Sequence, residues 1–156
     1  MKFIAIIRIV GQVGVNKPIK DTLSMLRLYK KHSCVIVPNN PSYLGMLKKI
    51  KDYVTWGEVD ESMIKELLLK RGKLHAKKNL TEEFLKENLK MDIDTFVKKF
   101  CTGEIKFTDV PGLKPFFKLS PPAKGFERGG TKKPYSMGGV LGYRKEKIND
   151  LIKRML

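Results

Sequence analysis

The sequence is poor in the residues from which most metal and catalytic sites are built. Among 156 residues it has two cysteines, Cys34 and Cys101, and two histidines, His32 and His75. None of them forms a cluster with carboxylates at metal-ligand spacing, and each histidine lies beside basic residues near a predicted helix end. We therefore predict no catalytic residue, metal or cofactor. Both cysteines are interpreted as reduced and structural, as in cytoplasmic proteins.

Long apolar runs are also missing. No stretch approaches the roughly 20 residues that span a membrane, and the apolar start lacks the basic region and cleavage site of a signal peptide. No segment joins a strongly basic helix face to a bulky apolar one, so the sequence predicts no membrane partner. The 42% of hydrophobic residues suffices for one domain with a core, or for a small domain with an extension.

Acidic residues are scarce relative to basic ones. The chain has 16 Asp and Glu against 32 Lys and Arg, a net charge of +16. Residues 1–59 carry ten basic and three acidic groups, and residues 111–145 carry eight and one, so each segment has a net charge of +7. Residues 60–110, with eleven and ten, are nearly neutral. Solubility does not require this distribution, but a polyanion that touches both basic segments does.

The first apolar stretch, residues 3–10, predicts a central strand. It is rich in isoleucine, and alternation places apolar side chains on both of its faces, so both faces should be covered. One face would hold Phe3, Ala5, Ile7 and Ile9, and the other Ile4, Ile6, Arg8 and Val10. The head of Arg8 either reaches water near the strand end or meets an anion there.

Two helices and two further strands are expected before residue 60. The pattern predicts a helix over 18–31, a strand over 33–38, a helix over 41–51 and a strand over 53–59. The result is an α+β, ferredoxin-like β-α-β-α-β unit with both helices on one face of a three-stranded sheet. The first helix should carry a polar stripe of Lys20, Ser24, Arg27 and Lys31, and the second should bury Leu44, Leu47 and Ile50.

The rest of the chain divides into two parts. We predict a β-α-β-α-β core over 1–59, a helical extension over 60–110, and a basic extended loop with a C-terminal helix over 111–156. Helices of the extension should begin at Asp60, Thr81 and Asp92 or Asp94, with glycine stops at Gly72 and near Gly103. The extension is expected to cover the face of the sheet that carries Ile4 and Ile6. A short strand is predicted at 116–119, and the helix from about 145 should pack on the core.

The glycine- and proline-rich segment 121–134 carries four cations, Lys124, Arg128, Lys132 and Lys133. It has no apolar period, so a disordered linker is one interpretation. The concentration of one charge sign favours a nucleic-acid contact, because an extended basic strip enters grooves that a folded domain cannot. We predict an extended loop that becomes ordered on a partner, and we expect the tail over 118–143 to be mobile without RNA.

The loop after the first strand, residues 11–17, resembles the phosphate loop of acylphosphatases. That loop ends in an arginine, whereas this sequence has Asn16-Lys17. A small acylphosphatase-like enzyme that uses this loop is therefore an alternative. The plainer interpretation is a strand-to-helix turn whose backbone N–H groups are free to meet a phosphate.

Eight short motifs follow one another along the whole chain. They are Ile7-Arg8-Ile9-x-Gly11-x-Val13-Gly14-Val15, Asp21-Thr22-Leu23-x-Met25-Leu26-x-Leu28, Cys34-Val35-x-Val37-Pro38, Lys51-Asp52-Tyr53-Val54-x-Trp56-Gly57, Leu69-Lys70-Arg71-Gly72, Phe117-Lys118-Leu119-Ser120-Pro121-Pro122, Arg128-Gly129-Gly130 and Ile148-Asn149-x-Leu151-Ile152-x-Arg154-Met155. Their order and spacing resemble large-subunit ribosomal protein thirty, in the long form of archaea and eukaryotes. The missing basic N-terminal arm points to an archaeal-type member. Residues 123–127 separate Pro122 from Arg128, unlike the tighter Pro-Arg-Gly-Gly tail of eukaryotic members.

The resemblance implies a sheet order of 3-1-2, with the first strand central, and a non-enzymatic role. It implies a structural constituent of the cytoplasmic large ribosomal subunit that binds large-subunit rRNA and helps to seat 5S rRNA. One copy per subunit, beside neighbouring ribosomal proteins, is expected. A free-standing RNA chaperone is the other non-enzymatic alternative.

Matching motif positions and the basic segments together give the candidate RNA-binding residues. They are Arg8, Lys17, Lys20, Arg27, Lys31, Lys48, Lys51, Arg71, Lys124, Arg128, Lys132, Lys133 and Arg144.

Overall fold

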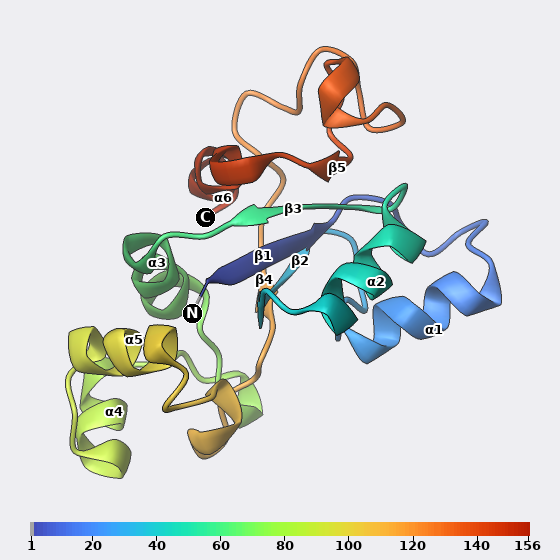
Figure 1. Ribbon diagram of the computed structural model, residues 1–156. Coiled ribbons are helices and arrows are strands. Elements are labelled where there is room, and N and C mark those ends of the chain that lie inside the picture. The colour runs from blue at the N-terminus through green and yellow to red at the C-terminus, as the bar shows by residue number, and fades with distance from the viewer. Residues whose placement is uncertain (1) are drawn as a thin grey trace.

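The computed structural model of the protein describes residues 2–156, and it is built on a five-stranded sheet (Figure 1). The strands are β1 (Phe3–Arg8), β2 (Ser33–Pro38), β3 (Val54–Glu58), β4 (Phe117–Lys118) and β5 (Gly142–Tyr143), in the order β4-β2-β1-β3-β5. The α+β class and the central position of β1 are confirmed. The predicted number of three strands is wrong, because β4 joins β2 at one edge and β5 joins β3 at the other.

β4 lies within the short strand predicted at 116–119, whereas β5 was not predicted, because its two residues are too few to show an alternating pattern. β1 itself is antiparallel to both β2 and β3, and all six of its residues are buried. It ends at Arg8, two residues before the predicted end. The N–H groups of Ile9 and Val10 both donate to the carbonyl oxygen of Tyr53, at 3.0 and 3.2 Å, so the regular ladder stops there.

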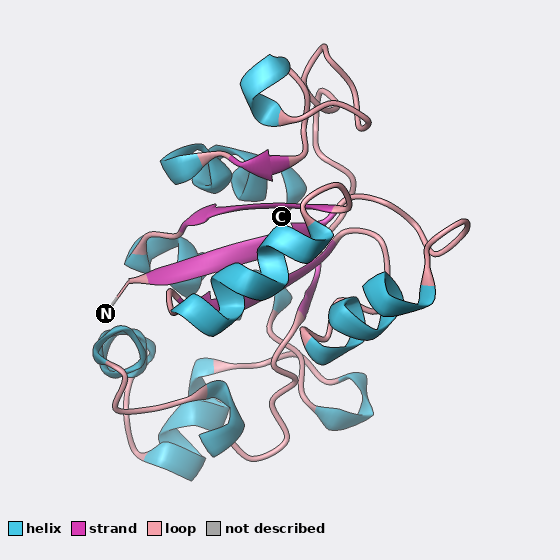
Figure 2. Ribbon diagram, turned by 45° about the vertical axis from the view of Figure 1, so that its right-hand side comes forward, coloured by secondary structure: helices cyan, strands magenta, loops and turns pink. Residues whose placement is uncertain are grey.

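Helices cover both faces of the sheet, as the two apolar faces of β1 predict (Figure 2). Helices α1 (Lys17–Met25) and α2 (Pro41–Ile50) bury the face that carries Ile4 and Ile6. Helices α3 (Glu61–Arg71), α5 (Ile93–Thr102) and α6 (Ile148–Met155) bury the face of Phe3, Ala5 and Ile7. The predicted assignment of faces is therefore reversed. Alternation shows that both faces are covered, but not which helices cover each.

Helix α1 ends at Met25, six residues before its predicted end. Arg27 adopts a left-handed φ of 60°, and the Leu28 N–H donates to the Leu23 carbonyl oxygen at 2.9 Å. This turn returns Leu28 to the core and leaves Met25 exposed. Arg27 and Lys31 therefore leave the helix, so the predicted four-residue polar stripe does not form. In α2, Leu47 and Ile50 are buried as predicted, whereas Leu44 is exposed.

The extension has the predicted helices, including α4 (Glu82–Leu89), whose first turn is capped by the Thr81 hydroxyl. Gly103 ends α5 with a left-handed φ of 87°, as a C-terminal glycine stop predicts. Gly72 differs, because its φ is −62°. There a Cβ would lie 2.3 Å from the Leu68 carbonyl oxygen, so glycine serves the close approach instead.

Four short 3₁₀ turns connect the longer elements: η1 (His75–Lys77), η2 (Phe107–Asp109), η3 (Tyr135–Met137) and η4 (Lys145–Lys147). The C-terminal helix α6 buries Ile148, Leu151, Ile152 and Met155 as predicted. Gly57 of β3 lets this region approach closely, since a Cβ there would lie 1.9 Å from the Lys145 carbonyl oxygen. Among residues 2–156, no helix combines the length and apolar character needed to cross a membrane.

Candidate nucleic-acid interface

Strand pairing brings most of the connecting loops to one end of the sheet. Arg8 pairs with Val54, Thr55 with Gly142, and Ser33 with Lys118. β1 and β4 therefore finish where β2, β3 and β5 begin. We call this the loop end; in Figure 1 the loop 9–16 (blue) extends from it to the right and the glycine-rich segment (orange) lies above the sheet. The loop 9–16, the segment 28–32, the turn 51–53 and the glycine-rich segment 120–141 all attach there.

Arg8 holds the loop end together from inside. Its side chain is only 3% exposed, and its guanidinium donates to the carbonyl oxygens of Leu28 at 2.7 Å, Val10 at 2.9 Å and Gly11 at 3.2 Å. Burial lowers the pKa of this guanidinium. The expectation that Arg8 contacts RNA does not fit these contacts, because its donors already face backbone carbonyls. The residue instead shapes the first loop and joins it to the segment after α1.

The neighbouring loops are tied to one another. The Gln12 side-chain amide donates to the Tyr29 carbonyl oxygen at 2.7 Å, which joins the loop 9–16 to the segment 28–32. Tyr53 accepts from the end of β1, which joins the turn after α2 to the same place. Five of the predicted cations, all exposed, are carried by these connected pieces and the adjoining helix ends: Lys17, Lys20, Lys31, Lys48 and Lys51.

The glycine-rich segment is folded on itself, not extended as predicted. The N–H of Gly129 donates to the Gly138 carbonyl oxygen at 2.9 Å, and that of Val140 to the Lys133 carbonyl oxygen at 3.0 Å. The backbones approach so closely that a Cβ on Gly129 would lie 2.5 Å from the Gly138 oxygen. Glycine is thus required here for packing as well as for turns. Four exposed cations stand on this folded segment: Lys124, Arg128, Lys132 and Lys133.

A buried ion pair fixes this segment to the sheet. Arg144, 2% exposed, donates to Glu127 Oε1 at 2.8 Å, to Thr55 Oγ1 at 2.9 Å and to the Val140 carbonyl oxygen at 2.7 Å. Its guanidinium also lies over the Tyr135 ring, 4.8 Å from the centroid. The predicted role of Arg144 as an RNA contact does not fit this burial. Its role is to bind together the start of the segment, its end and β3.

Glu127 was missed by the sequence reasoning, although it is the single acidic residue between 111 and 145. Its carboxylate also lies 3.4 Å from the guanidinium of Arg154 in α6. Burial raises the pKa of Glu127, but hydrogen bonds from Arg144 and the charges of both arginines outweigh it, so the pKa lies below its ordinary value. A lone carboxylate within a basic segment is the signal that could have found this internal partner.

Nine of the thirteen candidate cations gather at the loop end. They are exposed, and none forms an ion pair with a carboxylate of residues 2–156: Lys17, Lys20, Lys31, Lys48, Lys51, Lys124, Arg128, Lys132 and Lys133. We call these nine the basic surface. Unpaired, exposed cations of this kind can neutralise phosphates without first breaking internal contacts.

Two further candidates lie elsewhere or are partly engaged. Arg27 is exposed but stands beside Met25 and Pro38, where it lines a hollow of about 540 Å³ along the β2 edge. Arg71 is half-buried and donates to the Ser120 hydroxyl at 2.7 Å, so it ties the end of α3 to the chain after β4.

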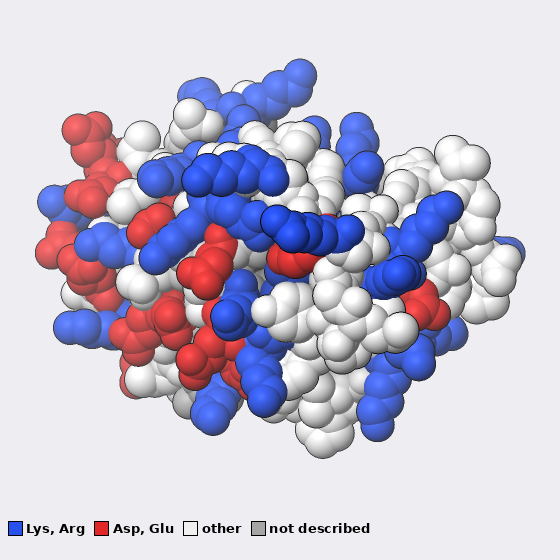
Figure 3. Space-filling view, turned by 90° about the horizontal axis from the view of Figure 1, so that it is seen from above, with Lys and Arg blue, Asp and Glu red and all other residues white. Residues whose placement is uncertain are grey.

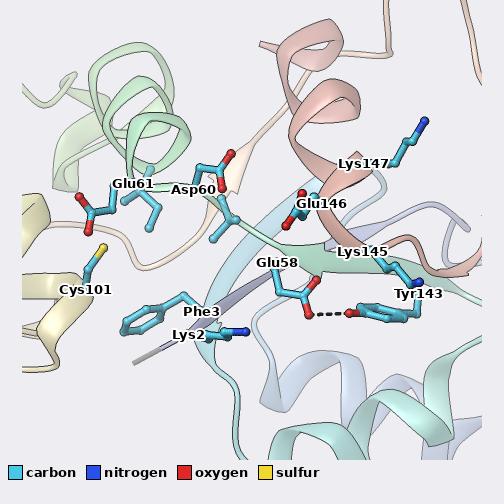
Figure 4. A pocket seen from close by; sticks show the side chains of 12 residues that line it. Lys2, Phe3, Glu58, Asp60, Glu61, Cys101, Tyr143, Lys145, Glu146 and Lys147 are labelled. Atoms are coloured by element: carbon cyan, nitrogen blue, oxygen red, sulfur yellow. Dashed lines mark hydrogen bonds between the residues drawn. The ribbon is translucent and has the colours of Figure 1, made fainter.

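The opposite end of the sheet, where β1 begins and β3 ends, contains a cavity with carboxylates in its lining. The cavity has a volume of about 760 Å³, and its charged lining consists of four carboxylates and three lysines: Glu58, Asp60, Glu61, Glu146, Lys2, Lys145 and Lys147 (Figure 4). The Tyr143 hydroxyl donates to Glu58, and this hydrogen bond raises the pKa of Tyr143 to about 12. Seen from above, most acidic side chains lie on the left half of the molecule, away from the loop end (Figure 3). Acidic side chains are therefore concentrated away from the loop end, whereas basic side chains occur at both ends.

Residues 4–54 match the model of a family described as Ribosomal protein L30p/L7e. The chain is 50% identical over 152 residues to Large ribosomal subunit protein uL30 of Methanococcus vannielii, covering 97% of this chain and 98% of the relative. It is 50% identical over 147 residues to the protein of the same name from Methanopyrus kandleri, covering 94% and 99%. The relative from Nanoarchaeum equitans is 46% identical over 156 residues, all of both chains. The similarity thus extends through the extension and the glycine-rich segment.

Proposed function

The chain belongs to the ribosomal protein L30p/L7e family, and we propose that it binds large-subunit rRNA through the basic surface at the loop end of its sheet. Its role is structural, as a component of the large ribosomal subunit in the cytoplasm. This family is not enzymatic, so the acylphosphatase-like alternative for the loop 11–17 falls away. A free-standing RNA chaperone is likewise disfavoured, because the relatives are named as proteins of the large subunit.

The observation that carries the proposal is the basic surface itself. Two segments of the chain, each with a net charge of +7, contribute all nine of its cations, and the fold brings both segments to one end. Lysine and arginine that neutralise phosphates release counterions, which supplies affinity and fixes the protein's register on the RNA. A surface built from both segments can hold two RNA strands or helices against one folded body.

We also propose a position and a copy number for the protein in the large subunit. The family resemblance supports a position where 5S rRNA meets the large-subunit rRNA, with one copy in each subunit. The neighbouring ribosomal proteins would contact faces other than the loop end. A direct test is quantification in purified large subunits, where a copy number clearly different from one would contradict this part of the proposal.

The RNA contact can be tested with matched charge variants. Replacement of Lys17, Lys31, Lys51 and Lys132 by Gln should lower the slope of log K against log salt for large-subunit rRNA transcripts by about 3, at roughly 0.7 to 0.9 per phosphate contact. The control replaces four exposed lysines of the helical extension, Lys78, Lys90, Lys98 and Lys106, and keeps the same net charge. Equal slopes for the two variants would refute the proposed surface.

A second measurement separates an integral component from a transient RNA binder. Ribosomes are washed in high salt, and the large subunits are sedimented. An integral component stays with the large subunit at salt concentrations that remove loosely bound proteins. Loss into the supernatant at low salt would contradict the proposal.

A further inference from the structure

Two turns at the loop end each expose one apolar side chain. Val13, in the loop 9–16, is 96% exposed, and Met137, in η3, is 70% exposed. Each precedes a glycine with a left-handed φ, Gly14 at 74° and Gly138 at 83°, so both stand where the chain reverses. Isolated exposed apolar residues are common on proteins, and exposure alone therefore identifies nothing. The supports and the neighbours of these two residues distinguish them.

The loop that carries Val13 is held on both sides of its tip. Before the tip, Arg8 binds the carbonyl oxygens of Val10 and Gly11, and Gln12 binds that of Tyr29. After the tip, Val15 is buried against the first two helices. Val13 is thus presented outward by a loop whose base is fixed.

The turn that carries Met137 is equally well held. The N–H of Met137 donates to the Pro134 carbonyl oxygen and that of Gly138 to the Tyr135 carbonyl oxygen, both at 3.0 Å. Gly139 packs so closely that a Cβ would lie 2.1 Å from the Lys133 carbonyl oxygen. Tyr135 itself lies under the buried Arg144 guanidinium. Met137 is therefore an exposed side chain on a tightly packed turn.

Val13 and Met137 both lie close in the chain to cations of the basic surface. Lys17 follows the loop of Val13, and Lys132 and Lys133 precede the turn of Met137. An RNA held by these cations would meet the two apolar side chains. In a continuous duplex the ring faces of the bases are hidden in the stack, whereas an unpaired nucleotide exposes them. Apolar side chains inserted beside bases use this kind of contact.

We propose that Val13 and Met137 are base-contacting residues, each packing on the ring face of an unpaired nucleotide of large-subunit rRNA. The proposal rests on the RNA-binding function above and adds the kind of RNA that is recognised. The cations bind the flanking phosphates, and Val13 and Met137 select bulged or looped nucleotides over continuous helix. Site selection then comes from apolar contacts, while most of the affinity comes from charge.

The test uses single variants and a closely matched control. Val13→Ser and Met137→Ser should each weaken binding to large-subunit rRNA transcripts about 5- to 10-fold, somewhat less than the loss of an aromatic stacking contact. The slope of log K against log salt should stay that of the wild type, because no phosphate contact is removed. Met25→Ser is the control, since Met25 is 71% exposed but stands at the other end of α1. All three positions are exposed, so folding should be unaffected.

The outcomes also separate this proposal from the RNA-binding function. Wild-type affinity in both Ser variants, together with a lowered salt slope in the four-lysine variant, would overturn the base contacts and leave the function standing. No change in any variant would overturn both. The base contacts would also be overturned if the Ser variants bound rRNA with wild-type affinity but were incorporated less into subunits. That result would assign Val13 and Met137 to a contact with a protein partner.

Chemical probing of unpaired bases provides a second measurement. The wild-type protein should protect particular unpaired bases, and these should become reactive again in Val13→Ser or Met137→Ser while the backbone protections remain. Protections that are identical in wild type and variants would contradict the proposal.

Discussion

Replacement of Glu127 by Gln should destabilise the glycine-rich segment, although it removes a negative charge from a strongly basic protein. The carboxylate is the anionic partner of Arg144, whose side chain is 1% exposed against 23% for Glu127. Removal of one partner from a buried ion pair costs roughly 3–5 kcal/mol. Glu127 is partly exposed and Arg144 keeps Thr55 and Val140 as acceptors, so we expect a loss of about 2 kcal/mol in the free energy of unfolding.

The assay is urea unfolding at pH 7, with amide exchange of residues 129–143 as the local measurement. A loss of about 2 kcal/mol corresponds to roughly 4–8 °C in Tm for a chain of this size. The control is Glu104→Gln, which makes the same change at an exposed carboxylate with no ion pair and should stay within about 0.5 kcal/mol of wild type. Equal stability of the two variants would refute the role assigned to Glu127.

The pH dependence follows from the lowered pKa of Glu127 in the folded protein. A carboxyl group whose pKa is lower in the folded state than in the unfolded state stabilises fully above the unfolded value, near 4.3 for Glu. That contribution is lost as the pH falls through the folded value. The stability difference between wild type and Glu127→Gln should therefore be constant above about pH 6 and narrow below about pH 4. A difference that widens on acidification would contradict the assignment.

For RNA binding by Glu127→Gln, the charge and the structure predict opposite changes. On charge alone, Glu127→Gln should strengthen binding, because the net charge becomes more positive. The structure predicts the reverse, since the variant loosens the segment that carries Arg128, Lys132 and Lys133. Tighter binding by this variant than by wild type would show that the segment does not need the ion pair to present its cations.

Three further changes test the internal contacts. Gly57→Ala should cost about 3 kcal/mol in urea unfolding, because its Cβ would lie 1.9 Å from the Lys145 carbonyl oxygen; wild-type stability would contradict this packing. Arg8→Met should cost about 2–4 kcal/mol by leaving buried carbonyl oxygens unpaired, with the salt slope of RNA binding unchanged; a lower slope at full stability would return Arg8 to the RNA surface. Burial raises the pKa of Cys34 to about 12. A thiol reagent at pH 8 should therefore modify the half-buried Cys101 first and reach Cys34 only on unfolding. Equal modification rates of the two cysteines in the folded protein would contradict this.

Much of the core could be predicted because its signals are local. The two apolar faces of residues 3–10 identified β1 as central, and β2 was predicted with its observed bounds, 33–38. Thr81 and Gly103 marked a helix start and a helix stop, because a capping hydroxyl and a left-handed glycine act on the adjacent turn. The uneven charge, read from composition alone, pointed to a polyanionic partner.

The early end of α1 shows where local signals compete. Apolar spacing favoured continuation to residue 31, but burial of Leu28 requires the chain to turn at Arg27. The gain from burying a leucine outweighs the small expense of a left-handed residue. For another reason, β5 was missed and β4 was predicted as a strand but not as part of the sheet: both strands exist only through pairing with β3 and β2.

The sequence by itself determined the charge, the central strand, the family and the elements whose signals lie within one turn or one strand. Only the tertiary structure decided which cations are available to RNA. Arg8 is engaged by Leu28, 20 residues away, and Arg144 by Thr55, 89 residues away. A sequence records the charge of each arginine, but whether its donors face water or carbonyl oxygens depends on acceptors that folding brings from distant segments. The same pairing of distant strands gathers nine separate cations at one end of the sheet.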